Sequence, residues 1–289
     1  MAEFPDWATT SGDIWARRWK DTDAALDALS PHLLSAIEAC APRAPFRAFE
    51  VGCGPGTTTI ALADRWPEAT IMACDISPAL AVIAEHRTAE HSNVRVLTGD
   101  AEALAAAEVP FELVYSRHGV MFFPDPVRAF GVLRNAASAG GALVFSCFQS
   151  WDLNPWASEV ANAAAGRLVP APGREPSGFA FAEPDYVLQI LDASGWTDAE
   201  ATPVSFRYLA GEGEHAADDA LSFLADLGPA SRRAPIHAAG RADGRAGADA
   251  PRDRAASRRA SRRVSGSRLD LAREGSLEVI RQLRGPLHV

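Results

Sequence analysis

Several features that are common in proteins are scarce in this sequence of 289 residues. Of its 28 basic residues only Lys20 is a lysine, and the others are arginines. Long apolar runs are missing, because stretches such as 141–148 are much shorter than the roughly 20 residues that cross a bilayer. The first residues carry no basic cluster of the kind that begins a signal peptide, so the default expectation is a cytoplasmic protein without membrane attachment.

Cysteine is also scarce, and the four cysteines are widely spaced: Cys40, Cys53, Cys74 and Cys147. They form no Cys-x-x-Cys pair, and no histidine stands near them at metal-ligand spacing. We therefore expect reduced, mostly buried thiols and no metal site. A disulfide or metal role is the alternative.

Aromatic residues and acidic charge are both depleted toward the end of the chain. No Phe, Tyr or Trp follows Phe223, and residues 231–289 hold 14 arginines against 6 acidic residues. The net charge is therefore +8 there and −17 over the first 230 residues. The stretch 231–267 has too few large apolar side chains to offset its ordering entropy, so we expect it to be disordered. The chain thus divides into three parts: N-terminal helices at 1–44, a main domain at 45–230 and a basic tail at 231–289.

Within the main domain, predicted strands alternate with predicted helices. The strands are expected at 46–51, 70–75, 93–97, 111–116, 141–148 and 202–209. Helices are expected at 57–66, 78–90, 125–138 and 183–193. Parallel strands need helical crossovers of this length, so the pattern predicts an α/β fold with a doubly wound, mostly parallel sheet. Upstream, five apolar residues place an apolar face on one or two leading helices: Leu26, Leu29, Leu33, Leu34 and Ile37.

An insertion rich in proline and glycine follows the fifth strand, at about 149–182. Its aromatic residues have no regular period: Trp151, Trp156, Phe179 and Phe181. We interpret the insertion as a lid over a substrate, with a packed surface excursion as the alternative.

Residues that suit ligand binding gather where the first three strands end. The first strand runs into Glu50-Val51-Gly52-Cys53-Gly54-Pro55-Gly56, whose glycines let the backbone approach a nucleoside. Asp75 ends the second strand, 19 residues after Gly56, where a carboxylate can accept hydrogen bonds from both ribose hydroxyls. Gly99-Asp100-Ala101 ends the third strand beside the same cleft. The alternative to ligand binding is a purely structural role, in which the glycines form a tight turn between strand and helix and Asp75 is a solvated residue at a strand end.

Together these residues resemble the class I S-adenosylmethionine-dependent methyltransferases, which have a Rossmann-like fold. The resemblance implies S-adenosylmethionine as cofactor, with Glu50 at its methionine end, Asp75 on its ribose and Ile76 on its adenine. Asp100 and the amide of Ala101 are then expected to read the adenine edge. The full set of cofactor-binding residues that the resemblance implies is Trp19, Glu50, Gly52, Cys53, Gly54, Gly56, Asp75, Ile76, Asp100, Ala101, Ser116 and Arg117. A nicotinamide-dependent oxidoreductase, the rival, usually places its third glycine one residue later.

A narrower resemblance comes from Ser-Arg-His-Gly-Val-Met-Phe-Phe-Pro-Asp-Pro at 116–126, together with Asn154-Pro155-Trp156. These motifs are similar to a bacterial branch of small-molecule methyltransferases related to ubiquinone and menaquinone biosynthesis enzymes. The stretch 15–23 resembles the entry helix of that branch, which folds over the cofactor. The branch usually carries phenylalanine where this chain has His118, so His118 is either a general base or a packing residue.

The expected reaction is methyl transfer to O, N or C of a small apolar or aromatic molecule. The chain lacks an Asn-Pro-Pro-Tyr turn after the fourth strand, and the charge of −17 would repel a phosphate backbone. A nucleic-acid partner is therefore not expected for residues 1–230. A protein that binds the cofactor without a productive substrate site is the second hypothesis.

The resembling family closes its sheet with a seventh strand, antiparallel between the fifth and sixth. After residue 230 the one apolar cluster is 276–283, and its spacing favours a helical turn over a strand. We therefore expect this strand to be missing, and we hypothesise that the reading frame shifts near Ser231. A basic tail that binds nucleic acid or an acidic surface is the alternative.

Overall fold

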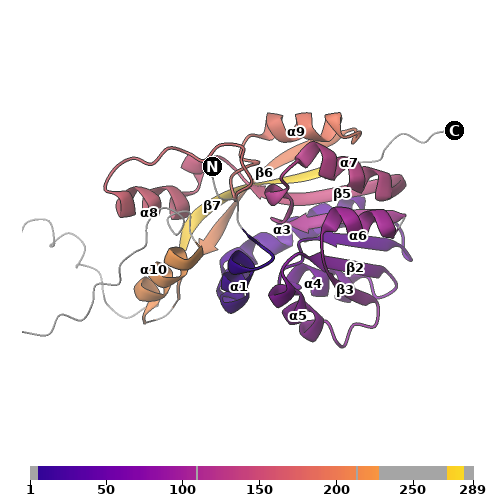
Figure 1. Cartoon of the computed structure of the whole chain (residues 1–289), viewed down its shortest axis with the longest axis horizontal. Helices are drawn as coiled ribbons and strands as arrows, with labels where there is room; N and C mark the ends of the chain where they lie inside the picture. The colour runs from indigo at the N-terminus through magenta and orange to yellow at the C-terminus, as the bar shows by residue number, and fades with distance from the viewer. Residues whose placement is uncertain (1–5, 109, 213, 228–271, 283–289) are drawn as a thin grey trace, which may run out of the picture.

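The computed structural model describes residues 6–108, 110–212, 214–227 and 272–282 (Figure 1). Within these ranges seven strands form one sheet in the order β3-β2-β1-β4-β5-β7-β6. The strands are β1 (Arg47–Val51), β2 (Thr70–Asp75), β3 (Val94–Thr98), β4 (Phe111–Arg117), β5 (Ala137–Phe148), β6 (Ala199–Leu209) and β7 (Ala272–Gln282). The strands β1 to β5 pair in parallel, so the predicted doubly wound, mostly parallel sheet is confirmed.

Helices cover both faces of this sheet. They are α1 (Thr10–Arg17), α2 (Trp19–Leu26), α3 (Ser30–Cys40), α4 (Thr57–Arg65), α5 (Pro78–Arg87), α6 (Ala101–Ala107), α7 (Pro126–Ala136), α8 (Pro155–Ala165), α9 (Pro184–Ala193) and α10 (Ala216–Leu227). Short 3-10 helices lie at η1 (Asp27–Leu29), η2 (Val120–Phe122) and η3 (Trp151–Leu153). The crossovers α4 and α5 lie with α3 in one layer, and in the second layer α7 contacts both α6 and α9.

Side chains at the ends of the strands start the crossover helices. Ser77 accepts a hydrogen bond from the amide of Leu80 at 3.3 Å and begins α5. Asp125 accepts one from the amide of Arg128 at 3.1 Å and begins α7, with Pro126 in the first turn. Because Pro has no amide hydrogen to satisfy, this position suits it. The motif around Pro126 is therefore a helix start, as the sequence predicts.

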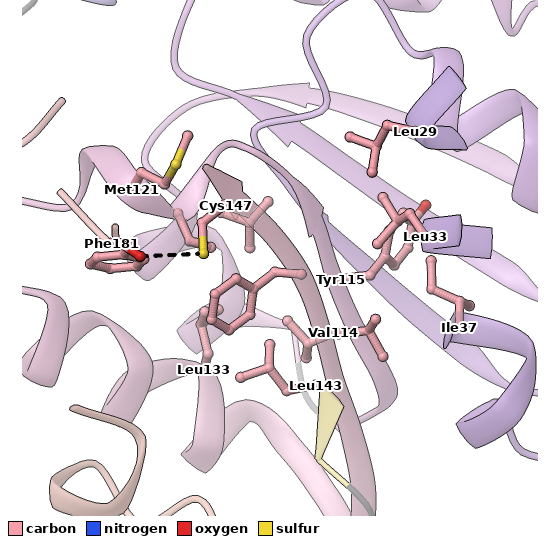
Figure 2. Packing of buried hydrophobic residues seen from close by; sticks show 14 of the residues in the cluster. Leu29, Leu33, Ile37, Val114, Tyr115, Met121, Leu133, Leu143, Cys147 and Phe181 are labelled. Atoms are coloured by element: carbon pink, nitrogen blue, oxygen red, sulfur yellow. Dashed lines mark hydrogen bonds between the residues drawn. The ribbon is translucent and has the colours of Figure 1, made fainter. Parts of the chain in front are cut away.

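The apolar core lies on both sides of the central strands. Leu33 and Ile37 of α3 pack on the side of the sheet that also carries Tyr115, while Leu133 and Phe181 pack on the other (Figure 2). All five side chains are at most 2% exposed. Burying an apolar side chain of this size contributes about 1.5–3 kcal/mol to the stability of the fold. The two layers therefore hold the strands, and the strand ends that carry the site, in fixed positions.

The leading segment contains more elements than the sequence predicts. Three α-helices and the 3-10 helix η1 replace the expected one or two helices, because the chain bends at Arg18 and again at Asp27. Helix α1 lies against α5 and α10, and α3 lies against β5 and β7. The N-terminal helices therefore reach from the β2 side of the sheet to the β6 side.

The expectation for the end of the chain is wrong in one respect. Residues 276–282 belong to strand β7 instead of a helical turn, and β7 lies antiparallel between β5 and β6. Its backbone pairs on both sides, with Phe145 opposite Ile280 and Val204 opposite Leu277. The slot between two strands overrides the local helical spacing, because each strand residue there gains backbone partners. The predicted disorder at 231–267 lies outside the described residues.

The insertion after β5 is packed into the protein. Its aromatic side chains Trp151, Trp156, Phe179 and Phe181 are at most 7% exposed. Trp156 stacks on Tyr208 of β6 with ring centroids 4.2 Å apart, and its indole N–H donates to Asn154 Oδ1 at 3.1 Å. Asn154 thus fixes the orientation of Trp156 at the start of α8.

Cysteines and acidic residues are dispersed in the described structure. None of the four cysteines forms a disulfide within the described residues, and Cys53, Cys74 and Cys147 are buried. Within the described ranges no three His, Cys, Asp or Glu residues come together in a way that could hold a metal ion. No helix in the same ranges has the length and apolar character needed to cross a membrane.

Candidate functional site

The glycine-rich turn between β1 and α4 has a backbone that favours glycine at three positions. Gly52, Gly54 and Gly56 have φ of 65°, 55° and 83°. A Cβ atom at Gly52 would lie 3.0 Å from Gly119 Cα, and one at Gly56 would lie 3.2 Å from Ala84 Cβ. At Gly54 a Cβ would meet no atom within 4 Å among the described residues. Packing therefore requires two of the glycines, whereas Gly54 borders open space that a ligand can fill.

Asp75 connects the end of β2 to this turn. The side chain is 7% exposed, and its Oδ2 accepts a hydrogen bond from the Gly54 amide at 2.8 Å. Its Oδ1 accepts from the Ser77 amide at 2.8 Å. Burial raises the pKa of Asp75, and the two amide hydrogen bonds oppose that rise. Each carboxylate oxygen keeps a second lone pair, which suits the two hydroxyls of a ribose.

The ends of β2 and β3 form the next part of the site. Gly99 donates its amide hydrogen to the Asp75 carbonyl oxygen at 2.9 Å, which holds the two strand ends together. Ile76 is 46% exposed, a large exposure for a branched apolar side chain. Asp100 is exposed and caps α6 by accepting from the Glu102 amide at 2.8 Å, and Ala101 is the first residue of that helix. An apolar surface therefore lies near hydrogen-bonding groups, as a flat heteroaromatic ring requires.

Glu50 and Cys53 lie beneath the turn. Glu50 is 1% exposed, and its Oε2 accepts hydrogen bonds from Thr59 Oγ1 at 2.5 Å and from the Tyr115 hydroxyl at 3.0 Å. Burial raises the pKa of Glu50 to about 7, although both hydrogen bonds and the charge of Arg117 lower it. Cys53 is buried and donates its amide hydrogen to the Cys74 carbonyl oxygen at 2.9 Å. Its thiol therefore serves packing, while its backbone shapes the turn.

The end of β4 is tied to the end of β1 by Ser116. Its hydroxyl donates to the Val51 carbonyl oxygen at 2.7 Å and accepts from the Gly119 amide at 3.0 Å. This arrangement brings the residues after Ser116 next to the glycine-rich turn.

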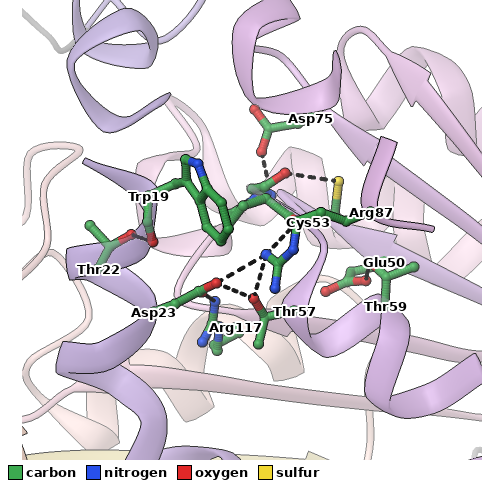
Figure 3. A network of polar contacts seen from close by, with 12 residues as sticks. Trp19, Thr22, Asp23, Glu50, Cys53, Thr57, Thr59, Asp75, Arg87 and Arg117 are labelled. Carbon is green, nitrogen blue, oxygen red and sulfur yellow. Dashed lines mark hydrogen bonds and ion pairs between the residues drawn. The ribbon is translucent and has the colours of Figure 1, made fainter. Parts of the chain in front are cut away.

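A polar network joins the N-terminal helices to this site (Figure 3). Asp23 of α2 accepts a hydrogen bond from Arg117 Nη2 on Oδ1 at 2.8 Å. On Oδ2 it accepts from Thr57 Oγ1 at 2.5 Å and from Arg87 Nη1 at 3.0 Å. The ring of Trp19, one turn before Asp23, lies beneath the Arg87 guanidinium, with Cζ 4.4 Å from the ring centroid. The structure thus brings the predicted residues Trp19 and Arg117 together.

Sequence reasoning missed three participants in these contacts: Thr57, Arg87 and Tyr115. No spacing in the sequence relates α2 to β4, which are joined by an ion pair across 94 positions. The sequence indicated only that the stretch 15–23 resembles an entry helix that folds over the cofactor, and it did not predict the contact of Asp23 with Arg117.

Two polar atoms at the end of β4 are buried and lack a partner. Arg117, with a side chain 9% exposed, leaves Nη1 without a hydrogen bond to any described residue. His118 leaves Nε2 without one in the same part of the chain. An unsatisfied buried polar group costs about 1–3 kcal/mol, and more when it is charged. Such atoms are suited to contact a ligand.

The His118 ring is held from its other side. Its Nδ1 lies 2.9 Å from Ser146 Oγ, and its ring packs edge-on against Phe148 with centroids 4.3 Å apart. The backbone φ of His118 is 64°, in the left-handed region that residues other than glycine rarely adopt. Burial lowers the pKa of His118 to about 3, and the charge of Arg117 acts in the same direction. The histidine is therefore neutral at pH 7 and is a weak base.

Comparisons with known proteins agree with the resemblance seen in the sequence. Residues 48–141 match a family described as a methyltransferase domain. The chain is 28% identical over 181 residues to a malonyl-[acyl-carrier protein] O-methyltransferase of Xylella fastidiosa, which is 61% of each chain. It is 28% identical over 174 residues to a trans-aconitate 2-methyltransferase of Deinococcus radiodurans, which is 57% of this chain and 64% of that protein. These matches support the resemblance of the chain to the class I S-adenosylmethionine-dependent methyltransferases, with the methyltransferase domain at residues 48–141.

The fold of this chain also occurs in solved structures. The YcgJ protein of Bacillus subtilis superposes with a TM-score of 0.53 and 14% identity, covering 88% of this chain and 98% of that one. The chain spans less than two thirds of the length of the curated relatives described above. Its narrower resemblance to ubiquinone and menaquinone biosynthesis enzymes stays a prediction.

The described residues fit S-adenosylmethionine, the cofactor that the resemblance implies. Gly54 leaves room at the turn, and Ile76 exposes an apolar surface beside Asp75. The unpartnered Nη1 of Arg117 supplies a buried positive charge suited to a carboxylate. The predicted cofactor residues therefore lie along one path, from the β3 end to the β4 end.

Proposed function

We propose that the protein transfers the methyl group of S-adenosylmethionine to a carboxylate oxygen of a small organic acid. The observation that carries the acceptor class is the buried, neutral His118, whose Nε2 lacks a partner among the described residues. A side chain that is a weak base suits an acceptor that needs no deprotonation. Carboxylic acids with an ordinary pKa near 4 are already ionised at neutral pH.

The cofactor residues take roles that follow the contacts. Asp75 would hold the ribose hydroxyls, Ile76 would pack on the adenine, and Asp100 with the Ala101 amide would bind the adenine edge. Arg117 Nη1 would bind the carboxylate of the methionine moiety. The amide groups of the glycine-rich turn, ordered by Glu50 from below, would line the remainder of the cofactor.

His118 would hold the acceptor rather than deprotonate it. When the Ser146 hydroxyl donates to Nδ1, the neutral ring carries its proton on Nε2, which can then donate to an acceptor carboxylate. Phe148 stands behind His118, and Trp156 lies 5.2 Å from Phe148 between ring centroids. These rings support an acceptor with an apolar body.

The names of the relatives support the same acceptor chemistry. Malonyl-[acyl-carrier protein] and trans-aconitate, the substrates in those names, both carry carboxyl groups. The net charge of −17 over residues 1–230 disfavours a docking surface for an acidic carrier protein. We therefore propose a free small acid, and a protein-bound acid is an outcome that the test below distinguishes.

The catalytic contribution of the chain would be alignment and exclusion of water. The sulfonium of the bound cofactor makes its methyl group electrophilic. Holding the acceptor oxygen in line with that group can supply on the order of 7–11 kcal/mol in favourable cases. Arg117 and His118 would fix the two reactants from adjacent positions of one strand end, and the packed aromatic rings would keep water away.

The test uses cofactor labelled in its methyl group. Purified protein is incubated with panels of free carboxylic acids, phenols and amines, and with an acyl-carrier protein loaded with malonate. Methyl esters release volatile labelled methanol in mild base, whereas N-, C- and phenolic O-methyl products retain the label. Base-labile label on a free acid supports the proposal. Stable label on a phenol or amine overturns the carboxylate acceptor, and label on the carrier protein alone overturns the free small acid. Cofactor binding without any product supports the binding-protein hypothesis.

A further inference from the structure

The N-terminal cover, defined here as residues 6–26 with α1 and α2, lies directly on the cofactor residues. Gly12 of α1 has no room for a side chain, because a Cβ there would lie 2.4 Å from Ser77 Oγ and 2.2 Å from the Trp7 carbonyl oxygen. Ser77 follows the predicted adenine-binding residue by one position. On the other side the Trp7 ring lies 4.6 Å from the Phe122 ring of η2. The cover therefore spans from the β2 end to the segment after β4.

One carboxylate fastens this cover to three elements. Asp23 contacts Thr57 at the start of α4, Arg87 at the end of α5 and Arg117 at the end of β4. Its side chain is 14% exposed, and that of Arg117 is 9% exposed. Buried charge-assisted hydrogen bonds of this kind are stronger than exposed ion pairs and fix geometry as well. Arg87 Nη1 also donates to the Pro55 carbonyl oxygen at 2.8 Å, which extends the contact into the glycine-rich turn.

The charges of this network do not balance. In the ion pairs of the described residues, Arg87 and Arg117 share the single carboxylate of Asp23. Among these three side chains one positive charge is in excess, while the buried Glu50, on which the charge of Arg117 also acts, has a pKa raised to about 7. The Nη1 of Arg117, which has no hydrogen-bond partner among the described residues, lies within the same group. A second anion would balance the charge and satisfy that nitrogen. Because Asp23 occupies Nη2, it determines where Nη1 points.

We propose that Asp23 is a positioning residue that holds Arg117 so that its Nη1 receives the methionine carboxylate of the cofactor, and that fastens the N-terminal cover over the bound cofactor. This inference rests on the proposed cofactor site. It adds a residue from a helix outside the glycine-rich turn and the strand ends. Cofactor binding and cover closing are coupled through this one side chain.

The test compares Asp23→Asn with Asp21→Asn as a matched control. Asp21 lies on the same helix, but its side chain is 49% exposed and pairs with Arg18. Calorimetry measures the affinity for S-adenosylhomocysteine, which carries the carboxylate, and for adenosine, which lacks it. Asp23→Asn is expected to weaken S-adenosylhomocysteine binding at least about tenfold and to leave adenosine binding unchanged. Asp21→Asn should change neither.

A second readout follows the cover itself. Trypsin cleavage after Arg17 or Arg18 should be slowed by S-adenosylhomocysteine in the parent protein and in Asp21→Asn, and should not be slowed in Asp23→Asn. If Asp23→Asn fails to fold by circular dichroism, Arg117→Lys replaces it. Lysine can keep the ion pair with Asp23 but has no second nitrogen for the ligand, so it should reproduce the selective loss of S-adenosylhomocysteine affinity.

The two proposals fail in different ways. If the parent protein binds neither S-adenosylmethionine nor S-adenosylhomocysteine, the cofactor site and this inference both fall. If the parent protein binds both and Asp23→Asn binds them equally well, the role of Asp23 alone falls. An equal loss of adenosine and S-adenosylhomocysteine affinity would also overturn it, since that pattern indicates general damage to the site.

Discussion

Ser146 Oγ lies 2.9 Å from Nδ1 of His118, and Ser146 is on β5, the strand next to β4, which ends one residue before the histidine. This contact fixes the ring and leaves its Nε2 as the atom that can meet a ligand. The same burial that brings the two residues together lowers the pKa of His118 to about 3. The sequence left a general base and a packing residue as alternatives for His118. The geometry supports a third role, in which a neutral imidazole donates a hydrogen bond.

We predict that His118→Phe lowers kcat/KM for the acceptor about tenfold or more, because it removes a hydrogen bond to an ionised group, typically worth about 1.5–3 kcal/mol. Cofactor affinity should stay unchanged. The pH profile of the parent protein should show no ionisation of His118 between pH 6 and 8. A titration near neutral pH that disappears in His118→Phe would restore the general-base role. Full activity of the variant would leave His118 a packing residue.

His118 also predicts how stability depends on acid. Its pKa is about 3 in the folded protein and near 6.5 in the unfolded chain, so the unfolded chain binds more protons between these values. Above pH 6.5 the histidine is neutral in both the folded and the unfolded state and costs no stability. The free energy of unfolding decreases as the pH is lowered from 6.5 toward 3. His118→Phe should flatten this part of the curve. Chemical denaturation at several pH values measures it, with His32→Phe on α3 as an exposed control.

Glu50 predicts a slope of the opposite sign. Its pKa is about 7 in the folded protein and near 4.5 in the unfolded chain, so the folded protein binds more protons over this range. The resulting stabilisation is full below pH 4.5 and is lost as the pH rises through 7. Glu50→Gln keeps an oxygen that accepts from Thr59 and Tyr115 but never ionises. We expect it to raise the melting temperature of the ligand-free protein at pH 8.

The same change should weaken cofactor binding, because the resemblance places Glu50 at the methionine end of the cofactor. Glu38→Gln is the control, since Glu38 forms an exposed pair with Arg65 on the far side of α3 and α4 from the turn. A lower melting temperature of Glu50→Gln at pH 8 would contradict the prediction that the ionised Glu50 carboxylate destabilises the folded protein. Unchanged cofactor affinity would remove Glu50 from the cofactor site.

Prediction from sequence succeeded where a residue type has a local geometric reason. The glycines at 52, 54 and 56 have positive φ, and Asp75 lies at the expected strand end beside Gly54. Prediction failed where distant segments decide the outcome. The apolar cluster in β7 has helical spacing, yet it becomes a strand because β5 and β6 offer backbone partners. The contact of Asp23 with Arg117 likewise depends on how α2 folds back, which no local pattern encodes.

Gly54 and Asp75 allow a direct test of the cofactor site. Asp75→Ala removes the carboxylate predicted to bind the ribose, which should weaken S-adenosylmethionine binding about tenfold or more. Gly54→Ala places a methyl group in the open space beside the turn, and Gly54→Val adds a branched side chain at a φ of 55° that such residues rarely adopt. Affinity should fall in the order parent, Ala, Val.

Gly131→Ala is the matched control for these variants, because a Cβ there also meets nothing within 4 Å among the described residues. Gly131 lies on α7, away from the turn, and alanine has the higher helix propensity. Unchanged affinity of Asp75→Ala and both Gly54 variants by calorimetry would refute the site. If the parent protein binds a nicotinamide dinucleotide instead, the alternative of a nicotinamide-dependent oxidoreductase is favoured.

Strand β7 predicts how the protein depends on the end of its chain. Its position between β5 and β6 gives both of those strands a partner, so deletion of residues 272–289 leaves two strand edges unpaired. Unpaired edges invite pairing with other chains. We expect the deleted protein to melt at a lower temperature and to aggregate, as light scattering would measure, while Glu38→Gln behaves like the parent. Equal melting temperatures would mean that β7 adds nothing to the sheet. Intact-mass measurement of the native protein tests the frameshift hypothesis at the same time: a mass of 30.7 kDa matching this sequence would refute a shift near Ser231 and make β7 the native closing strand.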